Sequence, residues 1–192
     1  MTSVLGATQV WWHLARSSGL VAWALAALTV LWGLALSTRA LGRRPKAPWL
    51  LDLHRFLGGL TVLFVGVHLL GLWADAYVQF DAADLFVPFA SSWRPVAVAW
   101  GVIAFYFLLA VEVTSLLMKR LPKRWWRRIH LTSYLVYGLA TVHLLTAGTD
   151  ATSPAVYWVA LASLAGVSFF SVYRWVGPGR QGSTGRIAGS PS

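Results

Sequence analysis

The sequence contains no cysteine and few acidic residues. The absence of cysteine excludes disulfides, thiolate nucleophiles and metal sites built from thiolates. Asp and Glu together number 6 against 16 Lys and Arg, and charged residues make up only 11% of the 192 residues. Soluble domains usually contain about 25% charged residues, whereas 57% of this chain is hydrophobic. The composition therefore excludes an ordinary soluble domain.

Long apolar runs account for this composition. Each has about the 20 residues that a helix needs to cross a hydrocarbon layer of about 30 Å. The sequence therefore predicts an all-α integral membrane protein, a bundle of five transmembrane helices within residues 1–176. The segment 177–192, rich in Gly and Ser, is expected to be a disordered tail. The five runs cover roughly residues 10–36, 53–74, 95–118, 129–147 and 154–176.

The net charge of +10 is distributed unevenly along the chain. Asp75, Asp81, Asp84 and Asp150 lie in the loops that alternate with the basic loops. Loops rich in Lys and Arg favour the cytoplasmic side of a membrane. We therefore predict an external N-terminus and a cytoplasmic C-terminus. We interpret the basic loops as signals for topology and lipid contact, and not as a surface for nucleic acid. The basic segments contain Arg39, Arg43, Arg44, Lys46, Lys119, Arg120, Lys123, Arg124, Arg127, Arg128, Arg174, Arg180 and Arg186.

Four histidines lie in two of the apolar runs. His54 and His68 belong to the second run, and His130 and His143 belong to the fourth. Because one span separates these runs, the two helices point in the same direction. His54 and His130 should then lie at one depth near the cytoplasm, and His68 and His143 at another depth near the outside. At a rise of about 1.5 Å per residue, the two depths are about 20 Å apart.

Two imidazoles at each depth suggest a particular cofactor. Polar residues within the bilayer are costly and usually functional, and neutral imidazole is a common axial ligand of haem iron. Structural zinc needs four converging ligands, whereas each depth offers two. A single histidine in such a helix would more often serve packing. The four together predict two bis-histidine haem sites between the second and fourth helices.

Two geometric questions stay open at this point. Thirteen residues are about 3.6 turns of an ideal helix, so His143 would point about 140° away from His130. Either the fourth helix is wound differently, for example near Gly138, or the two haems attach at different angles. Nearby small residues would admit a flat macrocycle or would serve helix packing. These residues are Gly58, Gly59, Gly66, Gly71 and Gly138.

The histidine spacing resembles that of the ferric reductase-like transmembrane domain. An H-x13-H pair followed by an H-x12-H pair on a later parallel helix is typical of this superfamily, which includes ferric reductases, NADPH oxidases and the haem-binding membrane subunit of bacterial methionine sulfoxide reductase systems. The segments "LDLHRFLGG" and "WRRIHLTSYLVYGLATVHLLTAGTD" are similar to short bacterial members, and the likeness covers residues from roughly 10 to 175. The resemblance implies an inner b-type haem on His54 and His130 and an outer one on His68 and His143, in a bacterial cytoplasmic membrane.

Several other polar residues are candidates for roles near such haems. Arg55 and Arg127 flank the inner histidines and are candidates for propionate contacts, although a topological role is an equal alternative for Arg127. Arg16 and Arg94 are the only basic residues expected outside, which makes them propionate candidates for the outer haem. We expect His13 to be interfacial, Met118 to serve packing, and Glu112 to be protonated or paired.

These features predict transmembrane electron transfer from a cytoplasmic or membrane donor to an extracytoplasmic acceptor. The family's oxidases and eukaryotic reductases continue into a flavin and nicotinamide domain, whereas this chain stops at Ser192. We therefore expect any flavin to be on a partner protein. A quinol-oxidising haem subunit that feeds a partner reductase is an alternative. A haem-free scaffold or small transporter with proton-handling histidines is an alternative of another class.

Overall fold

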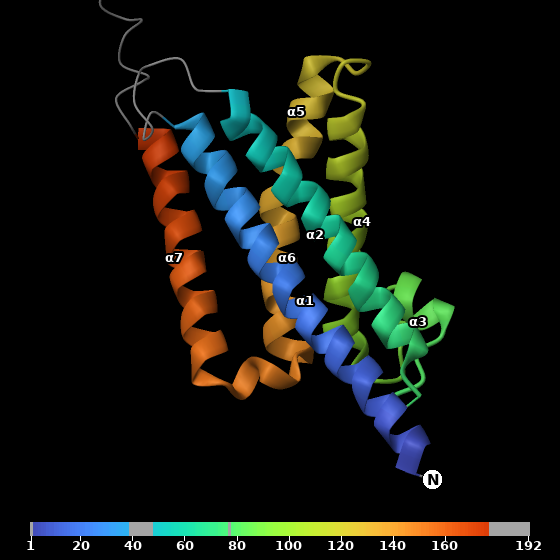
Figure 1. Ribbon diagram of the computed structural model, residues 1–192. Coiled ribbons are helices and arrows are strands. Elements are labelled where there is room, and N and C mark those ends of the chain that lie inside the picture. The colour runs from blue at the N-terminus through green and yellow to red at the C-terminus, as the bar shows by residue number, and fades with distance from the viewer. Residues whose placement is uncertain (1, 39–47, 77, 177–192) are drawn as a thin grey trace, which may run out of the picture.

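The computed structural model describes residues 2–38, 48–76 and 78–176, and this part of the chain is helical, with no strand. Figure 1 shows long helices side by side, with short helices at the ends of the bundle. Arginines 39, 43, 44, 180 and 186, Lys46 and the predicted tail 177–192 lie outside the described residues. The helices are α1 (Thr2–Ser37), α2 (Pro48–Ala74), α3 (Ala82–Phe86), α4 (Pro95–Leu116), α5 (Lys123–Leu131), α6 (Ser133–Ala147), the 3₁₀ helix η2 (Thr149–Thr152) and α7 (Pro154–Val176).

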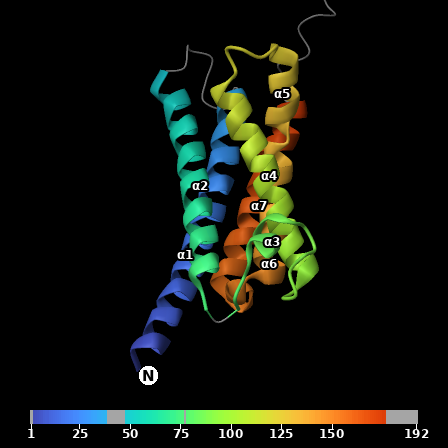
Figure 2. The same cartoon turned by 90° about the vertical axis from the view of Figure 1, so that its right-hand side faces the viewer.

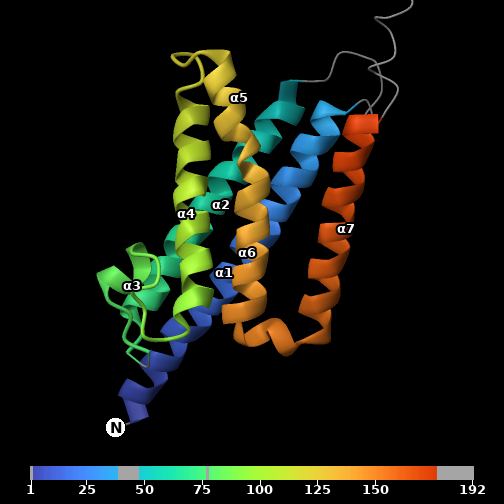
Figure 3. The ribbon, with the colours of Figure 1, turned by 180° about the vertical axis from the view of Figure 1, so that it is seen from behind.

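Four of the described helices are long and apolar enough to cross a membrane. They contain the segments Val10–Ser37, Pro48–Ala74, Pro95–Leu116 and Pro154–Arg174. The predicted fourth span, 129–147, is not one continuous helix, so four of the five predicted transmembrane helices are found as long continuous helices among the described residues. It is divided between α5 and α6, and α6 alone has 15 residues. Together α5 and α6 run back along α4 (Figure 3).

The division between α5 and α6 lies at Thr132. Its backbone N–H donates to the carbonyl of Ile129 at 2.9 Å, and its hydroxyl donates to the same carbonyl at 2.6 Å. A hydrogen bond over three residues belongs to the 3₁₀ helix, which has 3.0 residues per turn and is wound more tightly than an α-helix. The change in winding between His130 and His143 is therefore at Thr132, and not at Gly138.

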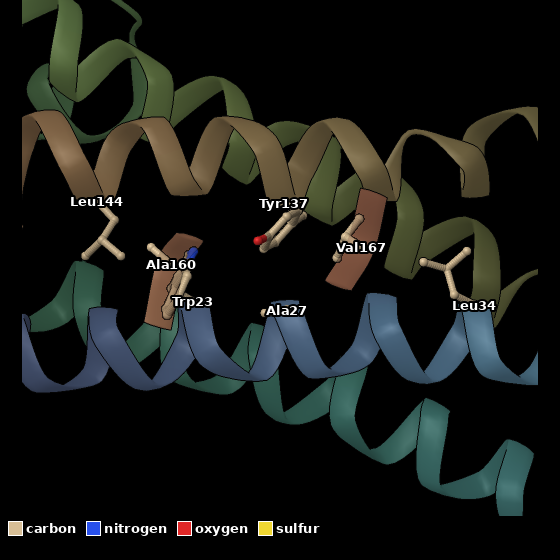
Figure 4. Packing of buried hydrophobic residues seen from close by; sticks show 7 residues of the cluster. All are labelled: Trp23, Ala27, Leu34, Tyr137, Leu144, Ala160 and Val167. Carbon is tan, nitrogen blue, oxygen red and sulfur yellow. The ribbon is translucent and has the colours of Figure 1, made fainter. Parts of the chain in front are cut away.

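Helix α1 lies at the centre of the packing. It packs along α2 and also contacts α6 and α7, while α4 packs against α5 and α6 (Figure 2). Lipid chains are as apolar as leucine, so association in a bilayer depends on close packing and interhelical hydrogen bonds. The core between α1, α6 and α7 is accordingly compact (Figure 4). It contains Trp23, Ala27, Leu34, Tyr137, Leu144, Ala160 and Val167.

Two side-chain hydrogen bonds connect the helices of this core. The indole N–H of Trp23 donates to the hydroxyl of Thr141 at 3.0 Å, which joins α1 to α6. The hydroxyls of Tyr137 and Ser163 lie 2.6 Å apart and join α6 to α7. Each bond satisfies a polar group that would otherwise be buried without a partner, so α1, α6 and α7 are held in one register.

The two ends of the bundle differ in charge among the described residues. The turn before α5 and α5 itself are basic, whereas the opposite end holds the aspartates of the loops after α2 and α6. At that acidic end, Asp81 caps α3 and forms a capping box with Asp84, with both N–H to carboxylate distances 2.9 Å. Leu85 of α3 then packs on Val98 and Val102 of α4, so the loop lies close to the end of the bundle.

Candidate functional site

The four intramembrane histidines form two close pairs. The ring centres of His54 and His130 are 6.0 Å apart, and the planes of the two rings are inclined by 70°. The ring centres of His68 and His143 are 6.4 Å apart, with an inclination of 80°. Helix α2 supplies one member of each pair, and α5 and α6 supply the others. The tighter winding at Thr132 contributes to this result, because it turns His143 towards the face that carries His130.

Backbone carbonyls orient both histidines of the pair near the acidic end. His68 Nδ1 lies 2.7 Å from the carbonyl oxygen of Ala15 in α1, and His143 Nδ1 lies 2.8 Å from that of Ala97 in α4. A carbonyl oxygen only accepts hydrogen bonds, so each Nδ1 carries the proton. The second nitrogen, Nε2, is then left with a free lone pair, as in histidines that bind metals.

Glycines allow these two rings to approach the neighbouring helices. A Cβ atom on Gly19 would lie 2.8 Å from His68 Nδ1, and one on Gly101 would lie 2.8 Å from His143 Nδ1. Both glycines follow the accepting carbonyl by four residues, one turn along the same helix. Any other residue there would push the imidazole away from its carbonyl, so these glycines position the rings.

The pair near the basic end has different surroundings. His54 packs on Gly33, whose added Cβ would lie 3.0 Å from His54 Cε1. His54 Nδ1 faces the backbone of Thr29 but is a buried nitrogen without a hydrogen-bond partner among the described residues. His130 Nδ1 lies 3.4 Å from the hydroxyl of Ser115 in α4.

Trp126 also belongs to the surroundings of His130. Its ring stacks on the His130 ring with 5.0 Å between centres and an angle of 20°. Its indole N–H is buried and has no acceptor among the described residues. A buried donor without an acceptor is costly, so this atom is suited to a group that the protein alone does not provide.

Sequence reasoning missed Gly19, Gly33, Gly101, Ser115 and Trp126. A signal for two of them exists, because Gly19 and Gly33 are 14 residues apart, the same spacing as His54 and His68. That match places a glycine of α1 opposite each histidine of α2. Which face of α1 meets α2 depends on packing, however, and packing is not visible in the sequence.

The glycines that the sequence did single out lie elsewhere. A Cβ on Gly71 would meet the Ala15 backbone at 3.0 Å, so Gly71 serves the packing of α1 on α2. A Cβ on Gly58 would lie 2.5 Å from Glu112 Oε1, which places the carboxyl of α4 over α2 one turn from His54. Added Cβ atoms on Gly59, Gly66 and Gly138 would meet nothing within 4 Å.

A cavity of about 190 Å³ contains the pair His68 and His143. Its walls are mainly apolar and come from α1, α2, α4 and α6. Polar groups at the acidic end of the bundle complete the lining, and Arg16 and Asp150 are among them. Arg16 is paired with Asp150, with its Nε 3.1 Å from Asp150 Oδ2. A flat apolar group with a charged edge would match this combination.

The other predicted arginines are placed differently. Arg94 donates to the carbonyl of Thr146 at 3.0 Å and lies over the Trp93 ring, and it is not among the described residues that line the cavity. Arg55 is exposed and pairs with Asp52 at 3.2 Å. Arg127 is exposed on α5. Of the four arginines, Arg16 has the placement most favourable for contact with a group beside His68.

The dimensions of both pairs fit a haem iron. A metal is about 2.0–2.1 Å from an imidazole nitrogen, which itself lies about 1.2 Å from its ring centre, so two imidazoles on opposite sides of one metal have centres about 6.4 Å apart. The observed separations are 6.0 and 6.4 Å. No group of three or more His, Asp or Glu able to hold a metal occurs in the described ranges. Each pair therefore offers two protein ligands, the number that a porphyrin-bound iron needs.

Fold and site together define a helical membrane protein with two layers of paired histidines. The family model described as "Ferric reductase like transmembrane component" matches residues 18–141, more than half of the chain, and the chain belongs to this family. This confirms the family that the histidine spacing predicted. The matched range includes three of the four histidines and ends two residues before His143. A comparison with curated proteins and with solved structures gave no match.

Proposed function

We propose that the protein carries electrons across the membrane through two b-type haems, an inner one on His54 and His130 and an outer one on His68 and His143. The observation that carries the proposal is the presence of two histidine pairs at 6.0 and 6.4 Å between ring centres, on helices of a family of ferric reductase-like components. When bound, haem supplies one-electron exchange at its iron. The domain that holds both haems covers residues 1–176.

The histidines restrict the chemistry of these sites. If haem binds, one histidine pair would supply two protein ligands beside the four porphyrin nitrogens, which would leave no position for oxygen or a substrate at the metal. The Ala15 and Ala97 carbonyls fix the tautomer and angle of the outer ligands, and a fixed ligand sphere requires little rearrangement when the charge of the metal changes. The protein is thus suited to electron transfer, and substrate chemistry belongs to the acceptor.

Other residues would hold the edges of the macrocycles. Arg16 lies at the outer cavity and is our candidate for an outer propionate, although it now pairs with Asp150. Arg94 is a weaker candidate, because its guanidinium is already bound to Thr146 and stacked on Trp93. At the inner site the candidates are Arg55 and Arg127, together with the unpaired N–H of Trp126.

The orientation of the protein follows from its charges. We place the basic end of the bundle in the cytoplasm of a bacterial cell, with α5 and α6 together counted as the fourth of five spans and the N-terminus outside. The donor is then a cytoplasmic flavoprotein or a membrane quinol, and the acceptor is extracytoplasmic. Segregation of Lys and Arg from Asp in the described loops supports this orientation.

Glu112 favours the quinol as a second candidate for the donor. Its carboxyl lies within a membrane helix against Gly58, one turn from His54. Oxidation of a quinol to a quinone releases two electrons, which the haems would take one at a time, and two protons. A carboxylate beside the inner site is suited to accept one of these protons, and water can accept the other. Reduction of the inner haem by a quinol in proteoliposomes should then slow in Glu112→Gln, while reduction by dithionite stays unchanged.

The absorption spectrum of the purified protein tests the proposed function. A reduced b-type spectrum with two haems per chain is the expected result. Correctly folded protein without colour would exclude electron transfer and would favour the haem-free scaffold or transporter. One haem per chain would limit the protein to a single electron site.

A further inference from the structure

We infer that the two haem sites are unequal in redox potential, with the outer site lower than the inner site, and that Ser115 is the positioning residue that adjusts the inner one. This inference rests on the proposed function. It is based on the hydrogen bonds of the four ligand rings. Both outer rings have short hydrogen bonds to carbonyls, whereas His130 has a long contact and His54 has no hydrogen bond of normal geometry.

The outer ligands donate strongly. Both Nδ1–H groups meet carbonyl oxygens, at 2.7 Å for His68 and 2.8 Å for His143, within the usual range of about 2.7–3.2 Å. An imidazole that donates its second N–H to a carbonyl becomes a more basic ligand. A more basic ligand stabilises ferric iron relative to ferrous iron, because the ferric ion carries more positive charge. The outer site should therefore resist reduction.

The inner ligands donate weakly. His130 Nδ1 is 3.4 Å from the Ser115 hydroxyl, beyond the usual hydrogen-bond distance. His54 Nδ1 faces the backbone of Thr29 beside Gly33, but it makes no hydrogen bond of normal geometry there. When Nε2 of His130 binds a metal, Nδ1 carries the proton and the Ser115 hydroxyl can only accept. The inner ligands are then less basic than the outer ligands, so the inner site is reduced to the ferrous state more easily than the outer site.

A repeat in the sequence explains why Ser115 is distinctive. In α4, the carbonyl of Ala97 accepts from His143, and Gly101 leaves room for the His143 ring to pack against the helix. Fourteen residues later, the positions that correspond to them hold Val111 and Ser115. The residue beneath the His130 ring is thus Ser115 and not a glycine, and its hydroxyl lies next to His130 Nδ1.

The charges at the two ends act in the same direction. Asp84 lines the outer cavity, and negative charge favours ferric iron. Arg127 and Arg128 lie on the helix that carries His130, and positive charge favours ferrous iron. Glu112 opposes this when it is ionised, because it lies near the inner site. Arg16 has little effect on the balance because it is paired with Asp150.

The difference in potential determines which site holds the electron when the protein has received only one. When one electron moves between the two sites, the site that gives it up is oxidised and the site that receives it is reduced, so a single electron would reside mostly at the inner site, which has the higher potential. Transfer to the outer site is then the unfavourable step, and it proceeds when an acceptor removes the electron outside. The protein would hold its first electron on the side of the donor.

Redox titration of the purified holoprotein, followed by absorption and electron paramagnetic resonance, tests the inference. The single-site variants His68→Ala and His54→Ala assign the inner and outer haems. We expect the equilibrium to favour reduction of the inner haem at least tenfold, a difference of about 59 mV for one electron. The same order should persist in Glu112→Gln. Equal potentials, or a lower potential for the inner haem, would overturn the inference.

Variants at Ser115 test the role of the hydroxyl. Ser115→Ala should raise the potential of the inner haem, with a change of less than tenfold in the equilibrium constant for its reduction, and should leave the outer haem unchanged. Ser115→Thr keeps the hydroxyl and should have the potential of the native protein. Thr114→Val is the matched control, because that neighbouring hydroxyl donates to the carbonyl of Ala110 in its own helix at 2.6 Å. An inner potential that is the same in Ser115→Ala would remove Ser115 from this role. Protein that binds no haem would contradict the proposed function itself, whereas two haems of equal potential would contradict only the inference.

Discussion

His143 Nδ1 lies 2.8 Å from the carbonyl oxygen of Ala97, so α4 orients a side chain that α6 carries. The same division holds for α2, whose His68 is oriented by the carbonyl of Ala15 in α1. The helices that carry the proposed ligands thus differ from the helices that direct them. This arrangement makes the outer site sensitive to changes on α1 and α4, which carry none of the four histidines.

The first prediction concerns the glycines beneath the outer rings. Gly19→Ala should displace His68, because the new Cβ would lie 2.8 Å from Nδ1, and should weaken outer haem binding by about 10–100-fold, as loss of a ligand's supporting contact does. Haem content and the spectrum of the outer haem measure the effect.

Gly59→Ala is the matched control for this experiment. Gly59 is exposed on α2, and an added Cβ would meet nothing within 4 Å. This variant should keep both haems, since alanine favours a helix over glycine by roughly 0.5–1 kcal/mol. Equal haem content in Gly19→Ala and Gly59→Ala would show that Gly19 does not position His68.

The second prediction concerns the assignment of ligands. His54→Ala and His130→Ala should each remove the same inner haem, because their ring centres are 6.0 Å apart and each variant leaves one axial ligand. His13→Ala should keep both haems, since His13 is exposed near the start of α1. Loss of spectroscopically different haems in the two inner variants would show that the pairs are wrongly assigned.

Much of this site could be predicted from the sequence, because depth in a membrane follows from counting residues. The partners of His54 and His68 follow from one intervening span and nearly equal spacing. The residues that contact each ring could not be predicted. Gly19, Gly101 and Ser115 face the histidines only because of the way α1 and α4 are rotated about their axes, and the sequence does not show this rotation. The division of the fourth span was also missed, since a threonine in an apolar run gives no sign that it will form a 3₁₀ turn.

The third prediction concerns orientation in the membrane. The native chain has no cysteine, so a single introduced thiol reports one position. Arg124→Cys should react with an impermeant maleimide only when the cytoplasmic side is accessible, and a tag after Ser192 should also be cytoplasmic. Asp81→Cys, in the acidic loop before α3, should react in intact cells. The reverse pattern would overturn the orientation inferred from charge.

The fourth prediction concerns the interhelical hydrogen bond between Tyr137 and Ser163, at 2.6 Å. Tyr137→Phe should lower the free energy of unfolding in mixed micelles by about 0.6 kcal/mol, the average for such bonds in membranes, and leave the haem spectrum unchanged. Tyr157→Phe, at an exposed tyrosine of α7, should have no effect. If both variants unfold like the native protein, the bond does not stabilise the packing of α6 on α7.

The last prediction concerns the direction of electron flow. The inner histidines lie towards the basic end of the bundle, where α5 provides a positively charged surface for an acidic or phosphorylated reductant. The outer histidines lie in a cavity at the acidic end. His68→Ala should therefore leave the inner haem reducible from the cytoplasmic side and abolish reduction of an external acceptor. Vesicles of known orientation, with reductant on one side and acceptor on the other, measure the two steps separately.

Two results would contradict this relay, each at a different point. Normal transfer to the acceptor in His68→Ala, with the outer haem shown to be absent, would mean that electrons leave from the inner site. Failure of every cytoplasmic reductant, together with ready reduction by a quinol, would move the entry point into the membrane. In that case the carboxyl of Glu112, placed against Gly58 one turn from His54, is the group that we expect to receive the quinol proton.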